Sequence, residues 1–187
     1  TNNFIPFIFS GIIHSDYYEF NGIDDYFEIP VNIAPQLSNS SFTIEFWAKL
    51  ITTTSYREIY SQGNTNVYSN YFTVSYGNGT SNELMKLDFH HHYKGWNISS
   101  YLNNWNHYAI TYDVSKNTRE EIAKLYINGI FIDASLYYGN IENGTTASGF
   151  VRIGKNSNSS GAYHLQGELK HLRVWNSVRT KNEIQSN

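Results

Sequence analysis

The sequence predicts an all-β fold, an antiparallel jelly-roll sandwich of two sheets. Segments in which apolar and polar residues alternate recur along nearly the whole chain, roughly every 8–12 residues, with turn residues between them. Helix signals are nearly absent. The 187 residues suffice for one domain, and we find no linker, low-complexity break or internal repeat among them. We therefore expect one domain spanning residues 1–187.

The expected strands follow from local patterns. Segment 42–50 alternates strictly, so its apolar residues share one face. The pair Asn128-Gly129 joins two alternating runs, 124–127 and 130–133, and both residues accept the positive φ of a type I′ hairpin turn. The other expected strands are 17–20, 26–29, 57–59, 72–76, 84–90, 107–112, 150–153 and 167–175.

One helical turn is expected near the end of the sequence, at 180–184. Thr180 can act as its N-cap, and Glu183 stands at the third helical position. This is the spacing of a capping box, in which each residue satisfies the backbone N–H of the other.

Composition argues against several classes of function. The chain has 13 Lys and Arg residues against 16 Asp and Glu, a net charge of −3, and no basic cluster, so we expect no nucleic-acid partner. No apolar run approaches the roughly 20 residues that span a bilayer, so no transmembrane segment is expected. The absence of cysteine excludes disulfides and thiolate sites. Because the sequence begins at Thr1 rather than Met, we expect it to be a mature form or part of a larger chain.

The chain resembles the laminin-G-like, concanavalin-A-like jelly-roll domains from about residue 17 onwards. The resemblance implies binding of glycans and cell-surface partners, the use of most such domains, and an extracellular location, either secreted or surface-attached. The segments that carry it occur in the order of the family: 20–30, 42–49, 105–113, the 128–129 hairpin, 167–175 and 179–184.

A second similarity points to a context. Residues 97–105, together with 125–133, are similar to the jelly-roll half of the receptor-binding region of clostridial neurotoxins, which belong to the same superfamily. This similarity implies a bacterial surface or toxin setting. The fold by itself does not fix the function.

Many relatives hold a structural Ca²⁺ with an Asp near the start of the last strand. Here Lys170 and His171 occupy that stretch, and neither is a hard-oxygen ligand. Asp24 and Asp25 are candidate calcium ligands, although their carboxylates can equally satisfy the backbone of the turn. The sequence requires no cofactor, and whether the protein binds calcium stays open.

The sequence lacks the carboxylate pattern of the glucanases of this superfamily. Those enzymes carry carboxylates at alternate positions of one strand, on one face and about 5–5.5 Å apart, as a retaining mechanism requires. Glu45 is followed on its face by Trp47 and Lys49, and Glu168 by Lys170. Other hydrolase motifs are missing too, so we expect no enzymatic activity.

Residues 88–96 form the most conspicuous polar constellation. If Phe89 and its alternate neighbours face the core, Asp88, His90 and His92 project together on the other face. His-x-His on a strand can bind Zn²⁺ or Ni²⁺ with a nearby carboxylate. The same residues can instead form a solvated strand end, or a contact that responds to pH because histidine charges at about pH 6.

Sugar binding needs aromatic faces that stack on a pyranose ring and planar polar groups that bind its hydroxyls. Aromatic residues stand in several segments that look like loops, and Trp96, next to Gly95, is the best candidate for a partly exposed ring. Trp47, Trp105 and Trp175 lie in segments that resemble strands of the family and should pack there. The candidate ligand-binding residues are Trp96, Tyr93, His92, His90, Asn97, Tyr137, Tyr138 and Arg57.

These observations favour a non-catalytic extracellular binding module that recognises a glycan or glycoprotein through loop aromatics. A protein–protein docking module is one alternative, since the same loops can contact a receptor. A spacer domain within a larger secreted toxin or adhesin is another.

Overall fold

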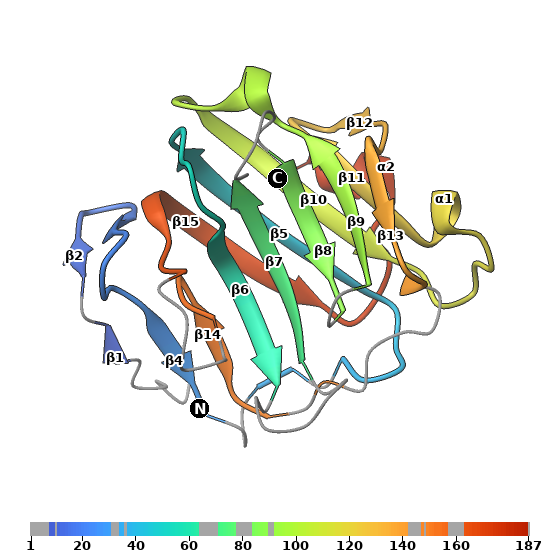
Figure 1. Ribbon diagram of the computed structural model, residues 1–187, viewed down its shortest axis with the longest axis horizontal. Coiled ribbons are helices and arrows are strands. Elements are labelled where there is room, and N and C mark those ends of the chain that lie inside the picture. Colours follow the sequence, from blue (N-terminus) through green and yellow to red (C-terminus); the bar gives the residue numbers. More distant parts are fainter. Residues whose placement is uncertain are drawn as a thin grey trace.

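The protein is a sandwich of two antiparallel β-sheets (Figure 1). The computed structural model describes residues 8–9, 11–30, 34–35, 37–63, 71–77, 84–89, 92–141, 147, 149–156 and 163–186. Within these ranges every strand pair is antiparallel. The predicted fold class is therefore confirmed.

One sheet has eight strands in the order β1-β4-β14-β6-β7-β8-β9-β13, and β6, β7 and β8 form the front layer of Figure 1. Its strands are β1 (Ile8–Phe9), β4 (Phe27–Ile29), β14 (Val151–Ile153), β6 (Arg57–Gly63), β7 (Tyr71–Gly77), β8 (Leu84–Asp88), β9 (Tyr93–Asn97) and β13 (Leu136–Tyr138).

The second sheet has seven strands in the order β12-β11-β10-β5-β15-β3-β2. Its strands are β12 (Ile130–Ile132), β11 (Ala123–Ile127), β10 (Trp105–Tyr112), β5 (Phe42–Leu50), β15 (Gln166–Trp175), β3 (Tyr18–Asn21) and β2 (Ile12–Ile13). The helical elements are the 3₁₀ turn η1 (Ser99–Tyr101), α1 (Arg119–Ile122) and α2 (Lys181–Gln185). Of the helices formed by the described residues, none has the length and apolarity to cross a bilayer.

Aromatic rings from both sheets fill the space between the layers. The predicted apolar face of β5 is fully buried, and its Phe42 stacks on Phe72 of β7 with 5.4 Å between ring centroids. Phe42 also stacks on Tyr112 of β10 at 5.2 Å, and Phe89 meets Tyr112 edge-on at 4.9 Å. Such pairs contribute about 0.5–1.5 kcal/mol each beyond the area that they bury. Because side chains alternate along a strand, the residues between these inward rings face outward.

Two local predictions are confirmed. Asn128 and Gly129, between β11 and β12, have φ of 51° and 73°, as a type I′ turn requires. Thr180 caps α2: its hydroxyl accepts a hydrogen bond from the Glu183 N–H at 3.3 Å, and its own N–H donates to Glu183 Oε2 at 2.7 Å.

Two strands replace segments that we expected to be loops. β9 pairs with β8 on one side and with β13 on the other, where Tyr138 lies opposite Tyr93. The alternation of β9 is hidden in the sequence, because its inward side includes Lys94 and its outward side includes Gly95. β13 has three residues, too few for a pattern. β8 ends at Asp88, earlier than the expected segment 84–90.

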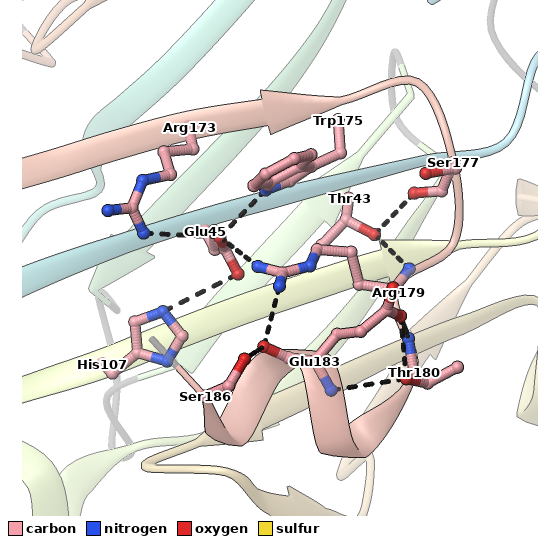
Figure 2. A network of polar contacts seen from close by, with 10 residues as sticks. All are labelled: Thr43, Glu45, His107, Arg173, Trp175, Ser177, Arg179, Thr180, Glu183 and Ser186. Atoms are coloured by element: carbon pink, nitrogen blue, oxygen red, sulfur yellow. Dashed lines mark hydrogen bonds and ion pairs between the residues drawn. The ribbon is translucent and has the colours of Figure 1, made fainter.

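A buried carboxylate lies on the outer face of the seven-stranded sheet (Figure 2). Glu45 of β5 is fully buried, and its Oε1 accepts hydrogen bonds from Arg179 at 2.6 Å and from the indole N–H of Trp175 at 2.9 Å. Arg173 Nη1 lies 3.7 Å from the same oxygen, and His107 Nε2 lies 3.8 Å from Oε2. Burial lowers the pKa of His107, so the imidazole is neutral at pH 7 and the arginines balance the carboxylate.

Arg179 connects this carboxylate to α2, as Figure 2 shows. Its second guanidinium nitrogen donates to the carbonyl of Glu183 at 2.8 Å, and its backbone N–H donates to the hydroxyl of Thr43 at 2.9 Å. The Thr43 hydroxyl donates to the carbonyl of Ser177 at 2.8 Å, and Ile184 of α2 is buried. The segment after β15 is thus attached to the sheet at several points.

We expect Glu45→Gln to lower the free energy of unfolding by about 3–5 kcal/mol, because it leaves the Arg179 charge buried without its partner. Urea denaturation measures the loss. Glu168→Gln is the matched control: Glu168 pairs at 2.8 Å with Lys49, whose side chain is 38% exposed, and such a pair contributes about 0–1 kcal/mol. Equal losses in the two variants would contradict the role of Glu45.

Candidate binding site

Polar side chains line the outer face of the eight-stranded sheet. On β7, Val74 and its alternate neighbours face the core, so Tyr71, Thr73 and Ser75 face outward. Thr73 and Ser75 are nevertheless only 3% and 5% exposed. Short outward side chains are this well covered because the larger side chains around them stand higher and form the walls of a hollow.

The hollow has a volume of about 360 Å³, within the range of small-ligand pockets, and we call it the outer groove. Strands β6 to β9 form its floor, and the segments before β6, after β14 and before β15 contribute to its walls. The outer groove is lined by Tyr56, Glu58, Tyr71, Thr73, Ser75, Lys86, Asp88, Tyr93, Asn156 and Tyr163.

Strand register arranges the outward side chains in two rows across the sheet. The first row, on β6, β7 and β8, is Glu58, Ser75 and Lys86. The second row, on β7, β8, β9 and β13, is Thr73, Asp88, Tyr93 and Tyr138. The first row therefore has a carboxyl group at one end and an ammonium group at the other. The second row has two aromatic rings side by side at one end.

Glu58 lies at the bottom of the outer groove, where it is 5% exposed. Its Oε1 accepts a hydrogen bond from the amide of Asn156 at 2.9 Å. Its Oε2 is buried and has no hydrogen-bond partner among the described residues, although Thr73 faces the carboxyl. Burial raises the pKa of Glu58 to about 8, against the opposing effects of Asn156, Thr73 and Lys86. The carboxyl group is therefore mainly neutral at pH 7.

The ammonium group of Lys86 lies among tyrosine rings. Its Nζ donates to the Tyr56 hydroxyl at 2.6 Å and lies 4.0 Å and 4.4 Å from the ring centroids of Tyr56 and Tyr93. Because β8 and β13 flank β9, Tyr93 stands between Lys86 and Tyr138, and the two tyrosine rings stack at 5.4 Å. Tyr138 is 60% exposed. It therefore offers an open aromatic face beside the groove.

Trp96 is not exposed. The prediction that its ring is partly exposed in a loop was wrong, since Trp96 lies on β9 opposite Met85 and is fully buried. Tyr93 faces outward on this strand, so the residue three positions later faces inward. A ring in the core does not stack on a sugar. Substitution of Trp96 therefore acts through core packing.

Tyr137 and Tyr138 lie on opposite faces of β13. Tyr137 lies opposite Lys94 in register, and Lys94 Nζ is 5.2 Å from the centroid of its ring. The Lys94 ammonium group points away from the outer groove and donates to the carbonyls of Arg119 and Ala123, at 2.8 and 2.6 Å, at the two ends of α1. Tyr137 is thus separated from the groove.

Arg57 and Asn97 bind nearby backbone. Arg57 Nη1 donates to the carbonyls of Gly22 at 3.0 Å and His164 at 3.2 Å, which connects β6 to two neighbouring segments. Asn97 is exposed, and its Oδ1 accepts from the Ser99 N–H at 2.9 Å. Neither side chain is among those that line the outer groove.

His92 contacts the turn after β13, where its Nδ1 accepts from the Asn140 N–H at 2.8 Å. His90, the other histidine of the predicted His-x-His site, lies outside the described residues. In the part of the chain that the structure describes, no group of three or more His, Cys, Asp or Glu side chains could hold a metal ion. A zinc or nickel site at 88–92 stays a prediction.

Asp24 and Asp25 both satisfy the turn between β3 and β4. The Asn21 N–H donates to Asp25 Oδ2 at 2.9 Å, and the Asn21 amide donates to Asp24 Oδ1 at 2.8 Å. Lys170, in the stretch where relatives place an Asp, pairs with Asp16 at 3.4 Å. The residues at this place do not fit the calcium site of those relatives, and the proposed binding does not depend on calcium.

Of the residues that line the outer groove, sequence reasoning named Tyr93 and Asp88 and missed most of the others, among them Glu58, Asn156 and Tyr163. Glu58 lies in β6, where polar and apolar residues are mixed, so no sequence pattern marked it as a buried carboxyl. Asn156 and Tyr163 carried no signal either. They reach the groove only because β14 pairs with β6, and because the Tyr163 carbonyl accepts from the Glu58 N–H at 2.9 Å.

We expect Glu58→Gln to change how stability depends on pH. Between pH 4.5 and about 8 the folded wild type keeps a proton on Glu58 that the unfolded chain has lost, so its free energy of unfolding falls as the pH rises. At about 1.4 kcal/mol per pKa unit, the loss reaches a few kcal/mol by pH 8. Urea denaturation of both proteins at pH 5 and pH 8 should show the variant gaining that much relative to the wild type. The same difference at both pH values would argue against a neutral Glu58.

The chain matches one known protein family. Residues 21–185 match the laminin G family model described as the concanavalin A-like lectin/glucanases superfamily. No curated protein matches the chain.

Several solved structures share the fold at low sequence identity. A native heptameric SAP-like pentraxin from Limulus polyphemus has a TM-score of 0.63 at 17% identity, over 96% of this chain and 79% of that one. Domain 4 of AbnA, a GH43 extracellular arabinanase from Geobacillus stearothermophilus, was solved with arabinotriose; its TM-score is 0.61 at 15% identity, over 99% and 82% of the two chains.

The ligand-binding domain of botulinum neurotoxin serotype D, solved with N-acetylneuraminic acid, has a TM-score of 0.64 at 14% identity. The match covers 99% of this chain and 43% of that one. Likeness at such identities shows the fold alone, whereas the family match covers most of the sequence. The chain therefore belongs to the concanavalin A-like lectin/glucanases superfamily.

Proposed function

We propose that this protein is a non-catalytic extracellular module that binds a glycan, free or on a glycoprotein, in the outer groove. The observation that carries the proposal is the lining of the groove, where tyrosine rings stand among hydrogen-bonding side chains. Phenol rings offer flat faces to the C–H groups of a sugar. Thr73, Ser75 and Asn156 offer hydroxyl and amide groups to its hydroxyls.

Two similar structures support a carbohydrate ligand, since one was solved with arabinotriose and the other with N-acetylneuraminic acid. The extracellular location rests on the family, whose laminin-G-like members work at cell surfaces. A single groove of this size binds a sugar weakly, so useful avidity would come from several copies in a parent molecule.

We expect the isolated protein to bind members of a glycan array and Tyr138→Ala to weaken that binding about threefold to tenfold, since an aromatic contact contributes about 0.5–1.5 kcal/mol. Phe131→Ala is the control, because Phe131 is also exposed, at 45%, but lies on β12 of the other sheet. The array is run with Ca²⁺ and again with a chelator, and binding lost with the chelator would support the calcium ligand prediction.

An array without signal in both conditions would remove the basis of the glycan proposal. A partner captured in a pull-down even after glycan removal would favour the protein-docking alternative instead. An apolar patch that becomes buried only in the parent protein would favour a spacer domain.

We also expect no turnover of chromogenic glycosides. The carboxyl residues that line the groove, Glu58 and Asp88, stand on β6 and β8 with β7 between them, rather than at alternate positions of one strand. A screen for chromophore release tests this. Turnover that Glu58→Gln abolishes would overturn the non-catalytic assignment.

A further inference from the structure

A buried carboxyl group lies at the bottom of the outer groove. Glu58 is 5% exposed, its Oε1 accepts from the Asn156 amide at 2.9 Å, and its Oε2 has no hydrogen-bond partner among the described residues. A buried polar atom without a partner destabilises the folded state, because its lost hydration is not replaced. A ligand hydroxyl that reaches this oxygen from the groove recovers part of that cost.

Among the described residues of the lining, the cationic and anionic side chains other than Glu58 balance one to one. β8 contributes both of them, Lys86 and Asp88. Asn156 and Thr73 complete the polar surroundings of the carboxyl. The titratable and charged lining groups, by element, are Tyr71 on β7, Lys86 and Asp88 on β8, Tyr93 on β9, and Tyr56 and Tyr163 in the adjoining segments.

We propose that the outer groove selects an uncharged sugar ring and that Glu58 Oε2 is the hydrogen-bond partner of one of its hydroxyl groups. A protonated carboxyl both donates and accepts, as a sugar hydroxyl does. Among the described lining residues Lys86 is the one cation, and Asp88 of the same strand is also in the lining. Lys86 Nζ donates to Tyr56 and lies within 4.4 Å of the Tyr93 ring centroid, so an acidic sugar would compete with Asp88 and with these contacts for the ammonium group. This inference rests on the proposed function and names the ligand class for the same groove.

Ionisation of Glu58 opposes this ligand. A sugar that displaces water from the groove removes hydration from the carboxyl, and this disfavours the charged form. Burial already raises the pKa of Glu58 to about 8, so the carboxyl changes state between pH 7 and pH 9. If the ionised form does not bind, affinity falls about tenfold over this interval.

Isothermal titration calorimetry at pH 7 and pH 9 tests the assignment with arabinotriose, neutral hexose trisaccharides and the sialylated forms of those trisaccharides as probes. The wild type should bind neutral probes best and lose up to about tenfold in affinity at pH 9. Glu58→Gln should abolish this loss, because an amide does not titrate. Glu58→Leu should bind about fivefold to tenfold more weakly at pH 7, the effect of one lost hydrogen bond.

Glu168→Gln, on the other sheet, is the control and should keep the wild-type pH profile. Carboxyl ¹³C NMR reports the protonation of Glu58 without any ligand, and the isosteric Gln variant keeps the test valid if the Leu variant does not fold.

If no probe binds although Glu58 titrates near pH 8, the proposed function fails, and the ligand class with it. If sialylated probes bind best, or the wild type and Glu58→Gln share one pH profile, this inference fails and glycan binding stands.

Discussion

Contact between the aromatic rings of the two sheets determines which side chains of each strand face the core and which face outward. Phe42 of one sheet stacks on Phe72 of the other, which fixes the inward faces of β5 and β7. Because the side-chain period of a strand is two, a shift of one residue would exchange the two faces completely. The same register therefore turns Glu45 toward α2 and Thr73 toward the outer groove. The attachment of the last helix and the shape of the groove are both consequences of core packing.

Two glutamates on outward positions are buried, and their surroundings differ. Glu45 contacts the guanidinium group of Arg179 and an indole N–H, so its oxygens are used within the protein. Among the described residues, Glu58 accepts from the amide of Asn156 and faces Thr73, while Lys86 donates to the hydroxyl of Tyr56. Desolvation then dominates for Glu58 and favours its protonated form. The first residue attaches the end of the chain to the sheet, whereas the second is the one to which we assign a ligand hydroxyl.

The fold could be predicted largely because its long strands carry a clear alternation and its turns carry local chemistry. Segment 42–50 and the Asn128-Gly129 turn needed no knowledge of distant residues. The groove could not be predicted in this way. Glu58 meets Asn156, which is 98 positions away, only because β14 pairs with β6. Trp96 was misplaced because Gly95 resembles a loop signal, although a strand also accepts glycine where it packs closely on a neighbour.

In the described part of the chain, the outermost strands of both sheets are short. β1 and β2 have two residues each, and β12 and β13 have three each. A long outer strand exposes a row of unpaired N–H and C=O groups to which another chain can add as a further strand, the usual start of aggregation. These borders offer little backbone for such addition. Many copies of the sandwich can therefore stand close together on one surface and still remain separate folded units.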